Sequence, residues 1–94
     1  MGAQGSAVLD FGATPTDEAA VVVTGQAGIV AGSHVEAFFM RESTGDNNEE
    51  EHEGMAIYCP LTVGTIVAGT GFTIYATMLA GYATGTFDVR WVWN

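Results

Sequence analysis

The sequence predicts an all-β protein: a small antiparallel β-sandwich or barrel of about seven or eight short strands, of which a jelly roll is one form. Three observations lead to this prediction. Gly occurs 13 times and Thr almost as often, which favours turns and strands over long helices. Apolar and polar residues alternate in several segments, separated by Gly, Pro, Asn and Asp clusters at roughly 8–12-residue intervals. No segment shows a convincing apolar period of 3.6 residues.

The first half of the chain holds three predicted strands. Residues 6–11 alternate modestly and run into a turn that contains Pro15. Residues 18–24 contain three consecutive valines, a run typical of strands buried on both faces. After a Gly-rich turn, residues 34–41 alternate again. One face of this third segment carries Val35, Ala37 and Phe39.

The second half resumes after a polar block at 42–53. Residues 55–59 are predicted to form a short strand that Pro60 ends, because proline cannot donate a hydrogen bond to a sheet. Residues 62–67 are β-branched except at Gly64. The cleanest alternation follows in residues 72–78 and in the final run, 86–93. In that run one face carries Phe87, Val89, Trp91 and Trp93.

The 94 residues are the size of one domain. We expect a single β domain (1–94) with a flexible N-terminal leader (1–5) and an acidic loop (42–53). The leader lacks the basic and apolar regions of a secretory signal, and the longest apolar stretch, 55–68, is too short to span a membrane. Cys59 is the only cysteine, so no disulfide forms within the chain, as suits a reducing cytoplasm.

The charge balance excludes two classes of partner. Eleven Asp and Glu face two Arg and no Lys, for a formal net charge of −9. Direct nucleic-acid binding and polybasic membrane binding both need many cations, so neither is expected. Charged residues make up only 14% of the chain, and outside 42–53 only seven of them are spread over some eighty residues. A surface made mainly of Ala, Gly, Thr and Val suits a protein that packs against copies of itself or a larger partner.

The acidic block holds six of the eleven carboxylates. Asp46, Asn48 and Glu50 fit the first ligand positions of an EF-hand loop, but the required glycine is replaced by Glu51. We therefore predict a solvated, self-repelling loop that blocks unwanted pairing between sheet edges, and its binding of a divalent cation stays open. The predicted solvent-facing carboxylates are Asp46, Glu49, Glu50, Glu51 and Glu53.

Catalytic, cofactor and metal sites are not expected. His34 and His52 lack the spacing of a metal motif, so His34 is predicted to begin a strand and His52 to be exposed. No serine lies in a Gly-x-Ser-x-Gly turn, and Cys59 lies in an apolar segment where it would act as a small hydrophobe. The pair Gly69 and Gly71 resembles the start of a nucleotide loop, but a strand follows and the chain has no lysine.

The aromatic residues have two interpretations. Exposed on one face, they would make a stacking platform for a sugar, whereas their strand spacing more simply supplies the core. Trp91 and Trp93 lie close together near the end of a small domain, so we expect one or both at a subunit interface, where Trp is enriched. The candidate interface residues are Trp91, Trp93, Phe87 and Tyr75.

Several segments together carry a resemblance to a known family. In chain order they are 24–29, 33–37, the polar loop that ends near His52, 68–75 and 85–93. They resemble segments of small virion structural proteins of tailed bacteriophages, over most of the chain from about Ser6 onward. Each segment is a strand-and-turn pattern, and none is a catalytic signature, so the resemblance assigns no residue a chemical role.

The resemblance implies a β-rich protein of the virion, assembled in the host cytoplasm. The leading hypothesis is a capsid decoration or cement protein that contacts the major capsid protein and copies of itself and stabilises the mature head. A tail component, such as a tube or fibre-attachment module, is the first alternative. A carbohydrate-binding module is the second.

Overall fold

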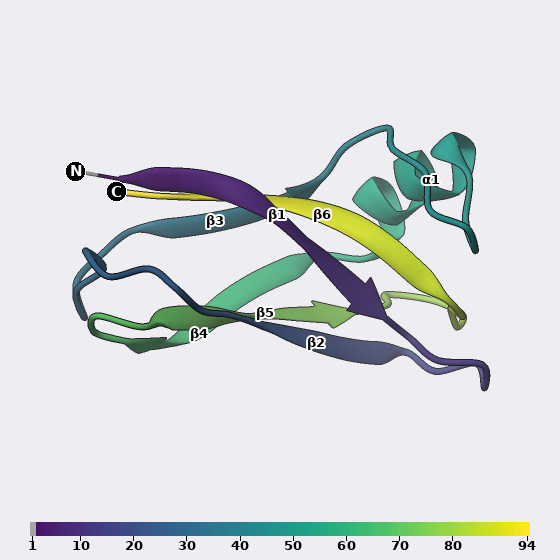
Figure 1. Ribbon diagram of the computed structural model, residues 1–94. Helices are drawn as coiled ribbons and strands as arrows, with labels where there is room; N and C mark the ends of the chain where they lie inside the picture. Colours follow the sequence, from purple (N-terminus) through teal and green to yellow (C-terminus); the bar gives the residue numbers. More distant parts are fainter. Residues whose placement is uncertain (1) are drawn as a thin grey trace.

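Two three-stranded antiparallel sheets pack face to face, and one short helix covers one end (Figure 1). The structure is a computed structural model that describes residues 2–94. The sheets have the strand orders β1-β6-β3 and β2-β5-β4. The elements are β1 (Ala3–Asp10), β2 (Glu18–Val23), β3 (Val35–Phe39), α1 (Glu49–Tyr58), β4 (Leu61–Val67), β5 (Gly71–Thr77) and β6 (Thr86–Trp93). The predicted small all-β sandwich is confirmed, with six strands in the described residues rather than seven or eight.

The period-2 patterns place the core as expected. In β6, Phe87, Val89, Trp91 and Trp93 all point inward and are buried. Phe72, Ile74 and Ala76 of β5 face them from the other sheet. The ring of Phe72 meets that of Trp91 edge-on, with centroids 5.4 Å apart, a favoured aromatic geometry. The strongest alternation in the sequence therefore forms the centre of the sandwich.

Two glycines allow close approach inside the sandwich. A Cβ on Gly5 of β1 would lie 2.5 Å from the ring of Trp91. A Cβ on Gly71, at the start of β5, would collide with the backbone carbonyl of Val23 in β2. The absence of a side chain at these positions lets an indole pack against β1 and lets β5 begin against β2.

The predicted flexible leader is wrong for residues 3–5. These residues are the first three of β1, and they pair with Trp93, Val92 and Trp91 of β6. Residue 1 lies outside the described part of the chain. β1 pairs along the whole length of β6 and satisfies the backbone groups on the side of β6 that β3 does not cover.

The predicted acidic loop is wrong in its second half, and so is the predicted strand at 55–59. Only residues 42–48 are non-helical, and α1 covers 49–58. Asn48 caps the helix: its side chain accepts a hydrogen bond from the Glu51 N–H, while the Glu51 carboxylate accepts one from the Asn48 N–H. Three glutamates in the first turn also favour the positive end of the helix dipole. Among residues 2–94, no helix has the length and hydrophobicity needed to span a membrane.

Candidate docking surface

The topology gathers the carboxylates at one end of an elongated molecule, whose extents are 35 × 20 × 20 Å. Both chain termini lie at the opposite end, as Figure 1 shows. The turn between β1 and β2, the segment 42–53 and the start of β6 all lie at the end where α1 packs. These segments, together with the ends of β1 and β2 next to the turn, carry every Asp and Glu of the chain except Glu36, which lies near the start of β3. We call this the acidic end.

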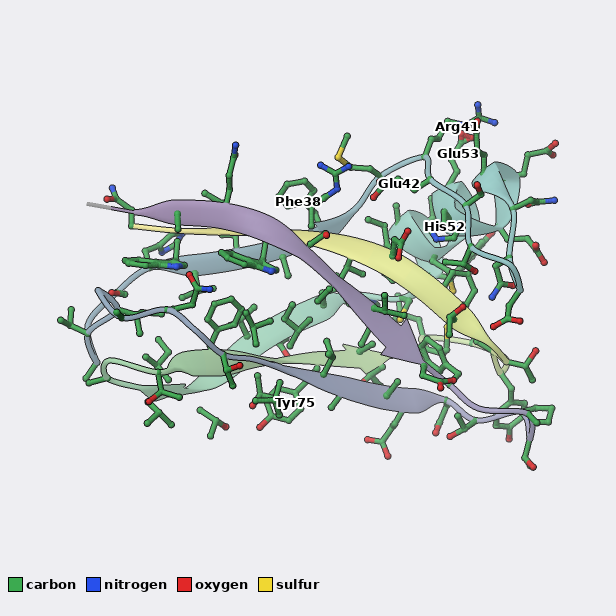
Figure 2. The ribbon with its side chains drawn as sticks, viewed as in Figure 1. Phe38, Arg41, Glu42, His52, Glu53 and Tyr75 are labelled. Atoms are coloured by element: carbon green, nitrogen blue, oxygen red, sulfur yellow. The ribbon has the colours of Figure 1, made fainter. Side chains whose placement is uncertain are left out.

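His52 fixes α1 to the first sheet (Figure 2). Its side chain is fully buried, so the predicted exposure of His52 is wrong. The ring Nε2 accepts a hydrogen bond from the backbone N–H of Asp88 in β6, at 2.9 Å. Nδ1 therefore carries the proton and donates it to the Asn48 carbonyl, also at 2.9 Å. The imidazole also packs against the Phe87 ring, so it serves as a structural connector.

The segment before the helix is also tied to β6. The Asp46 carboxylate accepts hydrogen bonds from the backbone N–H and the hydroxyl of Thr86, at 3.0 and 2.8 Å. The buried Asn47 amide donates to the carbonyls of Thr84 and Thr86. These bonds fix residues 46 and 47 against the sheet, although the Asp46 side chain reaches water.

Both arginines lie near this end and are engaged by glutamates. Arg90 forms a two-pronged ion pair with Glu42, with distances of 3.1 and 2.7 Å. The hydrogen bond from Arg90 lowers the pKa of Glu42 below its ordinary value. Arg41 lies 3.2 Å from Glu49 and 3.2 Å from Glu53, one helical turn apart (Figure 2). Since the chain has no lysine, the remaining carboxylates of the acidic end have no cationic side chain to neutralise them.

A groove of about 290 Å³ lies between α1 and the loop that joins β5 to β6. Buried Met55 and Phe87 line it together with the exposed rings of Tyr58 and Tyr82. Asn47 and Glu51 line its polar side. We call it the α1 groove. It combines apolar side chains with a carboxylate.

The predicted interface residues divide into two groups. Trp91, Trp93 and Phe87 are at most 6% exposed and form the core, so their predicted role at an interface is corrected. Both indoles are buried, although they lie near the end of the last strand, because β6 is the central strand of its sheet. Tyr75 is 40% exposed on the outer face of β5, and its hydroxyl is 2.7 Å from that of Thr65.

The predicted acidic residues are where the sequence indicated. Asp46, Glu49, Glu50, Glu51 and Glu53 are all exposed. His34 is exposed just before β3 and lies 3.2 Å from Glu36. Cys59 is buried as predicted, but it follows α1 rather than lying in a strand, and burial raises the pKa of its thiol. Within the described part of the chain, no group of three His, Cys, Asp or Glu side chains is arranged to hold a metal ion.

The sequence does not predict the α1 groove, although it singles out two residues of its lining, Phe87 and Glu51, for other roles. It predicts Tyr58 in a strand, and it offers Tyr82 only as one of the aromatic residues of a sugar platform or the core. One signal was present: Leu79 and Tyr82 are large apolar residues in a short connection that also contains Gly81 and Gly85. Large apolar side chains in a surface loop often belong to binding sites.

Comparison of the chain with known protein families, with curated proteins and with solved structures found no match.

Proposed function

We propose that this protein is a non-enzymatic structural component of a phage virion, a capsid decoration or cement protein that binds between subunits of the major capsid protein. The observation that carries the proposal is a surface rich in large exposed apolar side chains on a small, well-packed sandwich. The assignment to a phage particle rests on the resemblance of the segments described above to virion proteins.

The outer face of the β2-β5-β4 sheet illustrates this surface. Val22 is 67% exposed and Tyr75 is 40% exposed on neighbouring strands. Ala20, Thr62 and Thr77 surround them, and Glu18 is the one carboxylate on these three strands. Apolar surface of this kind gains free energy when a partner removes it from water, by about 25 cal/mol per Å². A charge-poor sheet face with exposed apolar side chains therefore supports packing against other proteins of an assembly.

The test is direct binding to virus particles. Purified protein is incubated with emptied heads and, separately, with tails of the phage whose genome carries this sequence. Each particle is then sedimented and the bound copies are counted. We expect binding to heads to saturate at a fixed ratio to the major capsid protein. An unrelated acidic β-protein of similar size is the control for protein that sediments with the particles without binding them.

Other outcomes would change the assignment. A few copies on each tail and none on heads would make the protein a tail component. Absence from both particles would contradict the virion role, and a carbohydrate array would then test binding to a sugar.

A further inference from the structure

We infer that the α1 groove is a docking site for a positively charged protein segment that inserts one apolar side chain. The inference rests on the proposed assembly role, because it names the surface that would contact a capsid partner. It places docking at the acidic end of the sandwich, away from the buried Trp91 and Trp93.

The apolar part of the site is formed by two segments that are far apart in the sequence. Tyr58, at the end of α1, is 56% exposed, and Tyr82, in the loop between β5 and β6, is 71% exposed; both line the groove. Leu79, 70% exposed in the same loop, lies beside it. The backbone N–H of Leu79 donates to the Tyr58 carbonyl at 2.8 Å, so the two segments are joined beside the groove. Tyrosine is enriched among the residues that dominate binding energy at interfaces. These exposed rings are therefore suitable anchors for a partner.

The walls of the groove are held in place before any partner arrives. His52 and the Asn48 cap fix α1, as described above. Two backbone hydrogen bonds between Thr16 and Ala83, at 3.1 and 2.9 Å, hold the loop on the opposite side. A preformed surface loses little conformational entropy on binding, which favours affinity.

The open shape of the groove favours a side chain over a cofactor. Pockets that enclose small molecules usually measure about 300–1,000 Å³ and bury most of the ligand. The α1 groove has a similar volume, about 290 Å³, but it is open to solvent beside the exposed rings of Tyr58 and Tyr82, so a small ligand would stay partly in water. One aliphatic or aromatic side chain of a protein segment fits this space.

The charge around the groove selects the partner. Glu51 lines the groove, and Glu50 precedes it on the exposed part of the same helix. The two arginines are engaged by Glu42, Glu49 and Glu53, so they do not offset these charges. A second copy that approached with its own acidic end would be repelled, as are nucleic acid and anionic lipid. A segment rich in Lys or Arg is attracted.

The experiment titrates ¹⁵N-labelled protein with a synthetic peptide that carries several lysines around a single leucine. We expect the largest shifts of backbone signals at Tyr58, Met78 and Tyr82, which line the groove, and an affinity that falls as salt is added. Tyr58→Ser and Tyr82→Ser should each weaken binding about tenfold, as expected for an anchor residue. Val30→Ser, at a similarly exposed position in the connection between β2 and β3, is the matched control and should leave affinity unchanged.

Three results would overturn the inference: shifts confined to the sheet faces, equal binding of a peptide with glutamate in place of lysine, or unchanged affinity in both groove variants. The spectra of the free variants check that each is folded. The binding test on virus heads separates this inference from the proposed function. Head binding that survives both groove variants would keep the capsid role and reject the groove. Peptide binding at the groove without binding to heads would keep the groove as a docking site and reject the capsid role.

Discussion

Trp91 and Trp93 lie two positions apart on the same face of β6, yet their indole N–H groups have different surroundings. The Trp93 N–H donates to the side-chain oxygen of Gln26 at 2.9 Å. The buried Trp91 N–H has no hydrogen-bond partner among residues 2–94. Since an unsatisfied buried donor destabilises the folded state, the two tryptophans contribute unequally even though both are equally buried.

Replacement by phenylalanine should reveal this difference. Trp93→Phe loses both volume and a hydrogen bond, whereas Trp91→Phe loses similar volume and removes an unsatisfied donor. We expect Trp93→Phe to reduce the free energy of unfolding by about 1–3 kcal/mol more than Trp91→Phe does. Urea unfolding followed by far-UV circular dichroism measures both. Equal losses would show that the Gln26 hydrogen bond contributes nothing.

His52 should be a major contributor to stability. His52→Ala removes two hydrogen bonds and leaves the Asp88 N–H without its partner, so we expect a loss of about 2–3 kcal/mol in the free energy of unfolding. His34 is exposed, and His34→Ala should change stability by less than about 0.5 kcal/mol. Urea unfolding at neutral pH compares them, and similar effects would contradict the role of His52.

The ion pair between Glu42 and Arg90 should make stability depend on pH. The hydrogen bond from Arg90 lowers the pKa of Glu42 below its ordinary value of 4.5 in the folded state. Its contribution is therefore present above pH 4.5 and is lost as pH falls through the lower, folded pKa. We expect Glu42→Gln to be less stable than the parent chain at pH 7 and the difference to close as the pH falls below 4.5. Urea titrations across this range measure the gap, and a constant gap would contradict the pairing.

At the scale of elements, α1 is the one segment that sequence periodicity did not predict. A helix usually shows an apolar stripe along its length, but here only His52 and Met55 are buried. Four of the first five residues are glutamates, and the last three, Ala56, Ile57 and Tyr58, are apolar but exposed. The local signal was the capping pair Asn48 and Glu51, which specifies where a helix begins without any periodicity.

Two substitutions in α1 should change stability in opposite directions. Asn48→Ala removes the cap and should cost about 1 kcal/mol. Gly54→Ala adds a methyl group with no atom within 4 Å and favours the helical backbone, so it should add roughly 0.5–1 kcal/mol. Thermal unfolding of the two variants provides the comparison. A loss from Gly54→Ala would indicate that α1 is not a regular helix there.

The edge strand β4 contains an irregularity that the sequence does not predict. Its register with β5 shifts between Gly64 and Val67, and Thr65 adopts a positive φ of 52°. The Thr65 hydroxyl meets that of Tyr75 on the adjacent strand. A bulge of this kind disrupts the row of free backbone groups along an edge and hinders pairing with another sheet. The sequence analysis predicts instead that the acidic loop at 42–53 blocks pairing between sheet edges.

At the scale of the whole molecule, the main feature is the separation of charge along the long axis. The carboxylates are spread through the sequence from Asp10 to Asp88, but the sandwich brings nearly all of them to one end. Their mutual repulsion opposes folding, because the unfolded chain holds them farther apart.

Salt should therefore stabilise the protein. Raising sodium chloride from about 10 to about 150 mM shortens the screening length from roughly 30 to roughly 8 Å, which weakens this repulsion. We expect the melting temperature to rise over that range at pH 7. At about pH 3, where most carboxylates are protonated, the same addition should have a much smaller effect. A fall in melting temperature with salt at pH 7 would show that the ion pairs of Arg41 and Arg90 outweigh the repulsion.

The sequence by itself determined the all-β class, the inward face of β6 and the exposure of the acidic side chains. Alternation with period 2 can be recognised within a single segment, and net charge follows from composition. Neither depends on how the strands are arranged. The burial of both tryptophans, the connection of His52 to Asp88 and the α1 groove depended on the tertiary structure. His52 and Asp88 are 36 positions apart, the groove joins α1 to the loop between β5 and β6, and the burial of the tryptophans depends on which strand is central in its sheet. Strand order is decided by the packing of the two sheets against each other, and no single segment encodes it.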